Sequence, residues 1–213
     1  MKPYYEHAGI TIYHGDCREI LPGLGPVDLV LTDPPYGIGD KGGKWGRKAE
    51  LAWDSHVVDG LGFILDAGEE QIIWGGNYYP LPPSRGWLVW YKRDSVPSAA
   101  DVELAWTSFD MNSRLIDQTI SATNAERVGH PTQKPLRVMA WCLSFAPDDC
   151  HLILDPFMGS GTTLVAAKQL GRRAIGIEID ERYCEIAAKR LEQEMLPFVA
   201  EQAEDAQQAG LFL

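Results

Sequence analysis

Short apolar segments rich in β-branched residues recur along the chain, and Gly, Pro or Asp bounds most of them. Such segments are typical of buried strands. The pattern predicts seven strands, at Ile10–His14, Val27–Thr32, Gln71–Gly75, Trp87–Tyr91, Glu103–Ser108, His151–Asp155 and Arg173–Glu178. Because strands that are apolar throughout bury both faces, we expect helices on both sides of the sheet.

Three segments have the hydrophobic period of helices. Leu136–Phe145 follows Pro135, Thr162–Leu170 follows a Ser/Gly/Thr cluster, and Glu181–Met195 carries its apolar residues at helical spacing. Strands that alternate with helices in this way predict a mostly parallel sheet, so the predicted fold class is α/β. The Gly- and Pro-rich segments 37–48 and 80–86 are interpreted as loops within one domain.

Length and composition narrow the class of protein. The chain has 213 residues, enough for one sizeable core, so we expect a single domain over residues 1–213. No apolar segment reaches the length of a membrane span and no secretory leader is apparent, so we expect a cytoplasmic protein. The four cysteines lie far apart without zinc-ligand spacing, which predicts reduced, buried thiols and no metal.

The charge is strongly acidic but uneven. The net charge of −11 argues against attraction of the whole surface to nucleic acid. Residues 178–213, however, hold nine acids and three bases, which is more than half of that excess. Lys41, Lys44, Arg47 and Lys48 instead form a cationic loop around Trp45, which is either a phosphate contact or an ordinary solvated loop.

Residues 151–180 read as strand, glycine loop, helix, strand and acid. Gly159 and Gly161 permit a tight turn and a close approach of a ligand, and the helix that follows offers free N–H groups. Glu178 stands where an acid takes the hydroxyls of a ribose. The third glycine of the dinucleotide fingerprint is absent, which predicts a nucleoside cofactor other than NAD. The alternative is a structural turn with a surface acid.

A second motif, Asp33-Pro34-Pro35-Tyr36, directly follows an apolar strand. The prolines fix two φ angles and remove two donors, so the chain leaves the strand stiffly. The Asp33 carboxylate and the Pro34 carbonyl can accept both hydrogens of an exocyclic amine, and Tyr36 offers a ring on which a base can stack. The structural alternative is a proline turn in which Tyr36 covers the core.

Together, Asp33–Tyr36 and the segment Asp155-Pro-Phe-Met-Gly-Ser-Gly161 resemble the catalytic and cofactor motifs of the S-adenosylmethionine-dependent DNA amino-methyltransferases. The catalytic motif comes first, as in the circularly permuted beta group, and Gly15-Asp16 and the run HPTQKP at 130–135 also match. The resemblance implies a Rossmann-like, seven-stranded methyltransferase sheet. It divides the domain into a catalytic part (1–40), target-recognition loops (within 41–129), a cofactor-binding part (130–195) and a flexible tail (196–213).

The resemblance also assigns roles. Asp33, Pro34, Pro35 and Tyr36 would hold the target amine and its base. Asp16 would meet the adenine amine of the cofactor and Glu178 its ribose, with Thr132 and Lys134 near the methionine carboxylate. Asp155 would hold either the methionine amine or the loop itself. The complete set for the cofactor is Asp16, Cys17, Thr132, Lys134, Asp155, Phe157, Gly159, Ser160, Gly161, Thr162 and Glu178.

The implied substrate is DNA. Asp rather than Ser at the first motif position resembles the enzymes that act on adenine N6, with cytosine N4 as the alternative and a non-catalytic accessory subunit as a further one. A base in a duplex must be flipped out to reach such a pocket.

Little sequence remains for reading DNA, which suggests a short site or help from a second subunit in a homodimer. Candidate phosphate contacts are Lys41, Lys44, Arg47, Lys48, Lys92, Arg93, Arg114 and Arg127, and the alternative for each is an ordinary surface residue. Near the end, Gln208, Leu211 and Phe212 resemble a sliding-clamp-binding peptide, and docking onto the protein's own core is the plainer alternative.

Overall fold

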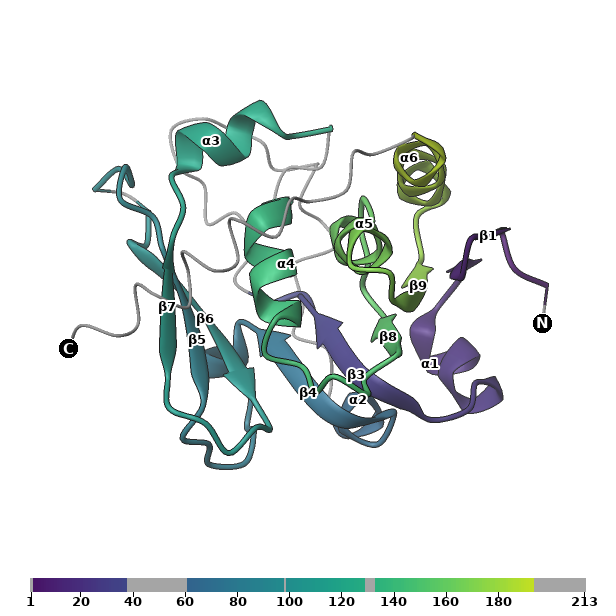
Figure 1. The fold of residues 1–213 in the computed structure, drawn as a ribbon, viewed down its shortest axis with the longest axis horizontal. Helices are drawn as coiled ribbons and strands as arrows, with labels where there is room; N and C mark the ends of the chain where they lie inside the picture. Colours follow the sequence, from purple (N-terminus) through teal and green to yellow (C-terminus); the bar gives the residue numbers. More distant parts are fainter. Residues whose placement is uncertain (1, 38–60, 98, 129–132, 194–213) are drawn as a thin grey trace.

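The computed structural model describes residues 2–37, 61–97, 99–128 and 133–193. Over these ranges the chain forms one sheet of nine strands in the order β1-β2-β9-β8-β3-β4-β6-β5-β7 (Figure 1). The strands are β1 (Tyr5–His7), β2 (Ile10–His14), β3 (Val27–Thr32), β4 (Gly68–Trp74), β5 (Trp87–Tyr91), β6 (Val102–Thr107), β7 (Arg114–Asp117), β8 (Leu152–Asp155) and β9 (Arg173–Glu178).

The middle of the sheet is parallel. β2, β9, β8, β3 and β4 are neighbours that run in one direction. β6 pairs antiparallel with both β4 and β5, β7 pairs parallel with β5, and β1 is an antiparallel edge strand beside β2. The prediction of a mostly parallel sheet is therefore confirmed.

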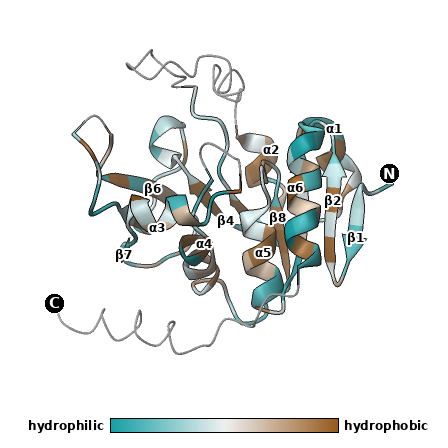
Figure 2. Cartoon of the chain, turned by 90° about the horizontal axis from the view of Figure 1, so that it is seen from above, coloured by the Kyte–Doolittle hydropathy of each residue, from teal (hydrophilic) through white to brown (hydrophobic). Residues whose placement is uncertain are grey.

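Helices cover both faces, as predicted. They are α1 (Cys17–Ile20), α2 (Gly62–Leu65), α3 (Ile120–Ala125), α4 (Leu136–Leu143), α5 (Thr162–Gln169) and α6 (Glu181–Glu192), with 3-10 turns η1 (Leu21–Gly23) and η3 (Gly76–Tyr78). One core cluster joins α4, α5 and α6 to the sheet, and a second joins α1 and α2 to the opposite face. In Figure 2, α6 shows a hydrophilic face, whereas α5 is largely hydrophobic because most of it is buried.

The predicted count of seven strands is wrong, because β1 and β7 add two. Both are edge strands, and they have only three and four residues. In each of them polar and exposed positions outnumber buried apolar ones, so the hydrophobic pattern carries no strand signal. Four of the predicted strands, β2, β3, β5 and β9, match their observed bounds at both ends.

All four cysteines are buried, unpaired thiols, as predicted. Within the described residues, no helix is both long and apolar enough to cross a membrane.

Asp155, at the end of β8, ties three elements together. Thr32 Oγ1 of β3 donates to Asp155 Oδ1 at 2.9 Å, and Thr163 Oγ1 of α5 donates to Oδ2 at 2.5 Å. The Phe157 backbone N–H also donates to Oδ1, at 3.1 Å. These contacts hold the glycine loop. Burial raises the pKa of Asp155 to about 7, although the three hydrogen bonds lower it.

This raised pKa predicts a pH dependence of stability. Below its ordinary value near 4 the carboxyl is neutral in both folded and unfolded chains, and as the pH rises to about 7 the folded chain loses stability, because it alone retains the proton. Between pH 4 and pH 7.5 we expect the free energy of unfolding of the wild type to fall by an amount on the order of 3 kcal/mol because of this group. In Asp155→Asn this contribution should be absent. Urea denaturation of both proteins at the two pH values measures this difference. An equal pH dependence would contradict the assignment.

Candidate active site

The carboxyl ends of neighbouring parallel strands carry most of the polar residues singled out in the sequence. β2 leads to Asp16, β9 ends at Glu178, β8 ends at Asp155, and β3 leads to Asp33. Because β2, β9, β8 and β3 are consecutive in the sheet, all four carboxylates lie along one edge. The next strand, β4, adds Gly75 to this edge. Ligands of open α/β sheets bind at such an edge.

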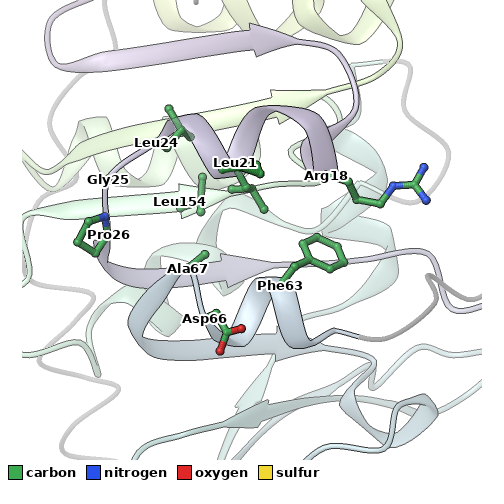
Figure 3. A pocket seen from close by; sticks show the side chains of 10 residues that line it. Arg18, Leu21, Leu24, Gly25, Pro26, Phe63, Asp66, Ala67 and Leu154 are labelled. Carbon is green, nitrogen blue, oxygen red and sulfur yellow. The ribbon is translucent and has the colours of Figure 1, made fainter.

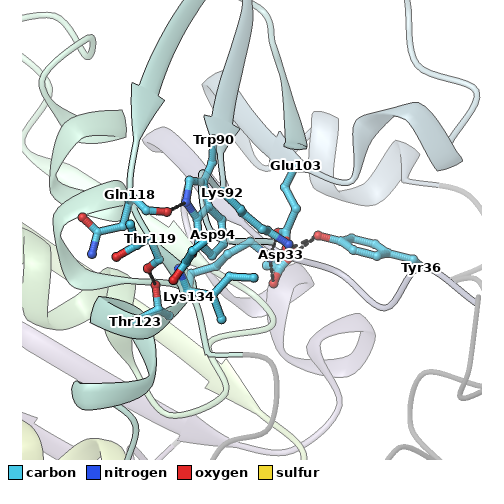
Figure 4. A network of polar contacts seen from close by, with 11 residues as sticks. Asp33, Tyr36, Trp90, Lys92, Asp94, Glu103, Gln118, Thr119, Thr123 and Lys134 are labelled. Atoms are coloured by element: carbon cyan, nitrogen blue, oxygen red, sulfur yellow. Dashed lines mark hydrogen bonds and ion pairs between the residues drawn. The ribbon is translucent and has the colours of Figure 1, made fainter. Parts of the chain in front are cut away.

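At the end of β3, Asp33 is fixed by two donors (Figure 4). The Tyr36 hydroxyl donates to Asp33 Oδ1, and Lys134 Nζ donates to Oδ2 at 2.5 Å. Lys134 Nζ also donates to the Tyr36 hydroxyl oxygen at 3.2 Å. The Pro35 carbonyl accepts a hydrogen bond from the Tyr79 hydroxyl. The Asp-Pro-Pro-Tyr turn is therefore held by side chains from two distant segments.

The ionic contacts continue beyond Asp33. Lys134 Nζ lies 3.1 Å from Glu103 Oε2 on β6, and Glu103 Oε1 is paired with Lys92. The Lys134 side chain is only 7% exposed. Burial lowers the pKa of Lys134, but the carboxylates of Asp33 and Glu103 outweigh burial and hold it well above its usual value. Lys134 is therefore an ammonium ion at physiological pH.

These contacts involve two residues singled out in the sequence. Lys134 was expected near the cofactor's methionine carboxylate, which stays a prediction, and its ammonium pairs with Asp33. Lys92 was expected to contact phosphate, yet its ammonium turns inward to Glu103. Sequence reasoning also missed Glu103, although an acid within a predicted strand is the signal that marks it.

Tyr36 lies directly against the backbone of Gly75. A Cβ at Gly75 would come within 2.0 Å of the Tyr36 ring, and the φ of +65° also favours glycine. The Tyr78 ring stacks on Tyr36 with a centroid distance of 5.1 Å and an interplanar angle of 20°. Tyr78 is 46% exposed. Tyr36 of the Asp-Pro-Pro-Tyr turn and Tyr78 of η3 thus form a pair of stacked tyrosines, of which Tyr78 faces solvent.

The glycine loop is shaped by positive φ angles and held from two sides. Gly159 has φ +50° and Gly161 has φ +79°, and a Cβ on Gly161 would meet the Ala187 Cβ at 2.7 Å. Glu178 Oε2 accepts from the Gly159 N–H at 3.0 Å, and Arg190 of α6 donates to the Ser160 carbonyl at 2.6 Å. Arg190 is a further residue that sequence reasoning missed.

Glu178 retains acceptor capacity. Its Oε1 accepts from the Asp180 N–H at 2.8 Å and its Oε2 from the Gly159 N–H, so each carboxylate oxygen accepts one of these backbone donors and has room for a second. Burial raises the pKa of Glu178, although these two hydrogen bonds lower it. The carboxylate can therefore take additional hydroxyl donors without losing its hold on the loop.

The other residues predicted for the cofactor have mixed surroundings. Asp16 caps α1 through the Arg18 N–H and pairs with the Arg18 guanidinium at 2.5 Å. Cys17 lies in the core, where burial raises its pKa to about 11. Ser160 and Thr162 are buried, and Phe157 is partly buried. Thr132 lies outside the described residues.

The predicted DNA contacts are largely untested. Lys41, Lys44, Arg47 and Lys48 lie outside the described residues, as do Gln208, Leu211 and Phe212. Arg93 forms an ion pair with Asp117 at 2.5 Å and is still 65% exposed. Arg114 is exposed on the edge strand β7.

A groove of about 510 Å³ lies elsewhere, between the α1–η1 segment and α2 (Figure 3). Its lining is mainly apolar, with Leu21, Leu24, Phe63 and Leu154 among the residues that form it. Neither Asp33 nor the glycine loop contributes to it. The strand-end cluster, rather than this groove, is therefore the candidate active site.

Comparisons with known proteins show the family of the chain. Residues 71–189, more than half of the chain, match the family model described as DNA methylase. Type II methyltransferase M.HpaI of Haemophilus parainfluenzae is 40% identical over an alignment 222 positions long, which covers 81% of this chain and 70% of that protein.

Two solved structures are similar in fold. The M1.HpyAVI–SAM complex aligns with a TM-score of 0.60 and 25% identity, over 86% of this chain and all of that one. The cytosine-N4-specific PvuII DNA methyltransferase aligns with a TM-score of 0.63 and 17% identity, over 97% and 94% of the two chains. The family match and the M.HpaI alignment, together with the Asp-Pro-Pro-Tyr turn and the glycine loop at one sheet edge, show that the chain belongs to the DNA methylases.

Proposed function

We propose that this DNA methylase transfers a methyl group from S-adenosylmethionine to the exocyclic N6 amine of adenine in DNA. The observation that carries the proposal is the position of the Asp33 carboxylate. Asp33 stands at the end of β3, on the same sheet edge as the glycine loop and Glu178. The similar protein M1.HpyAVI was solved as a complex with this cofactor.

The residues at this edge suit the cofactor. Glu178 keeps acceptor positions for two ribose hydroxyls, and Asp16, after the neighbouring strand β2, is a second carboxylate for an amine. Because Gly159 and Gly161 have no Cβ, the loop can adopt positive φ angles, and its backbone can approach a ligand closely. S-adenosylmethionine, when bound, supplies a methyl group that its sulfonium already activates.

The protein then has to orient and polarise the target. The lone pair of an exocyclic amine is delocalised into the base, so the amine is a weak nucleophile. Asp33 and the Pro34 carbonyl accept its two hydrogens and turn the lone pair outward. The Asp33 carboxylate also stabilises the positive charge that the nitrogen acquires with the methyl group, and the proton leaves the nitrogen afterwards.

The tyrosine pair completes the pocket. Tyr36 and the exposed Tyr78 present aromatic surface beside Asp33, against which an extruded base can stack. A base within a duplex reaches Asp33 only after rotation out of the stack. Adenine is proposed because Asp, and not Ser, precedes Pro-Pro-Tyr in this chain.

Asp33→Ala tests the acceptor role. Removing a group that stabilises developing charge costs about 10²-fold or more in rate, so we expect incorporation of labelled methyl into unmethylated genomic DNA to fall at least that far. The affinity for S-adenosylmethionine, measured by calorimetry, should stay near that of the wild type. Asp110→Ala, at an exposed acid paired with Arg85, is the matched control and should keep full activity. Near-normal methylation by Asp33→Ala would remove the assignment.

Glu178→Gln tests the cofactor site separately. The amide keeps the size of the side chain and one acceptor, but it loses the charge that strengthens hydrogen bonds from hydroxyls. We expect the Kd for S-adenosylmethionine to rise roughly tenfold, which corresponds to one charge-assisted hydrogen bond. Glu185→Gln, on the exposed side of α6, serves as control. An unchanged Kd for S-adenosylmethionine in Glu178→Gln would show that Glu178 does not bind the ribose.

A further inference from the structure

We infer that Lys134 is a positioning residue for the proposed reaction: its buried ammonium orients Asp33 and keeps it a carboxylate that can receive the target amine. This inference rests on the proposed function of Asp33, and it differs from the cofactor contact that the sequence suggests for Lys134.

The geometry fixes the plane of the Asp33 carboxylate. Lys134 Nζ donates to Oδ2 at 2.5 Å and the Tyr36 hydroxyl donates to Oδ1, so one donor holds each oxygen. A carboxylate has about four acceptor positions, so roughly two remain for an incoming amine. With the Asp33 side chain 23% exposed, these positions are accessible from outside while the carboxylate itself cannot rotate freely.

Contacts behind Lys134 hold its ammonium in place. Glu103 lies 3.1 Å away on β6, and the rings of Tyr36 and Trp74 lie 5.6 and 5.5 Å from Nζ, within the range of cation–π attraction. Trp74 is fully buried in β4, so the ammonium is enclosed by the sheet. A lysine held on so many sides is a fixed part of the site.

The charges of this network are balanced, and Lys134 is the ion-pair partner of Asp33. Lys92 pairs with Glu103 at the far end of the network, and Lys134 is closer to Asp33 than to Glu103. The network therefore contains two ammonium ions and two carboxylates. Truncating Lys134 would leave the partly buried Asp33 without its partner, which favours the protonated form of Asp33.

The ionisation of Asp33 depends on the groups that face it. Burial raises the pKa of Asp33, and Glu103 adds to this effect. Lys134 provides the largest opposing influence, and the Tyr36 hydroxyl also lowers the pKa. Asp155, joined to the neighbouring Thr32, is the other carboxyl nearby, and Asp33 raises its pKa. Removing Lys134 must therefore raise the pKa of Asp33 further.

The test compares Lys134→Met with the wild type in two independent readouts, the pH profile of kcat and the Kd for S-adenosylmethionine. We expect kcat at pH 7 to fall roughly tenfold or more, and the acid limb to move up by about 1–3 pH units, the usual effect of an adjacent opposite charge. Activity should recover towards alkaline pH, where Asp33 ionises again. The Kd for S-adenosylmethionine should remain near the wild-type value.

Three further variants make the result specific. Lys134→Arg restores the charge and should return the acid limb to its wild-type position. Lys134→Gln removes the charge but keeps a polar side chain, so it should shift the limb as Lys134→Met does and serves if the methionine variant does not fold. Lys189→Met, at an exposed lysine paired with Glu185, should change neither readout.

Other outcomes overturn the inference. A raised Kd for S-adenosylmethionine with an unmoved acid limb would assign Lys134 to the cofactor, and a loss of rate with neither change would make its role structural. Failure of the proposed function is recognised separately, because then the wild type would not methylate DNA or Asp33→Ala would remain active.

Discussion

The parallel alignment of five neighbouring strands is the constraint on which the site depends. β2, β9, β8, β3 and β4 end at one edge of the sheet, and their connections leave the core there. Asp16, Glu178, Asp155 and Asp33 meet at that edge although up to 162 positions separate them along the chain. The buried hydrogen bond from Thr32 to Asp155 joins β3 and β8 at the point where the Asp-Pro-Pro-Tyr turn and the glycine loop begin. The order of motifs along the chain is therefore immaterial to their arrangement in space.

The site also depends on the pairing of its charged side chains. Buried charges are unfavourable unless they are paired, and the site contains a balanced set: Lys92 with Glu103, and Lys134 with Asp33. Burial raises the pKa of Asp33, and its pairing with Lys134 opposes that effect. The pairing also explains why Lys134 is buried and Lys92 is mostly buried near the Asp-Pro-Pro-Tyr turn in a chain with a net charge of −11. The tyrosine pair beside Asp33 then supplies apolar surface without adding charge.

The sequence was sufficient for the fold class, for four strands at both ends, and for the two motifs that identify the family. The sequence was insufficient where contacts between distant segments determine which side chains meet. Lys134 meets Asp33 across 101 positions, and Glu103 reaches them because β6 inserts antiparallel beside β4, which no local pattern shows. The edge strands β1 and β7 escaped prediction because they are short and half-exposed. Local periodicity thus predicted the buried centre of the sheet, and the partners of the buried charges required the structure.

The most direct measurement of the account's central claim is the chemical identity of the product. Purified protein would be incubated with unmethylated DNA and S-adenosylmethionine, and the DNA digested to nucleosides for mass spectrometry. The account predicts N6-methyldeoxyadenosine, formed only when both DNA and cofactor are present. N4-methyldeoxycytidine would contradict the assignment of adenine while keeping the acceptor array, and unmodified nucleosides from a protein that binds the cofactor would contradict methyl transfer itself.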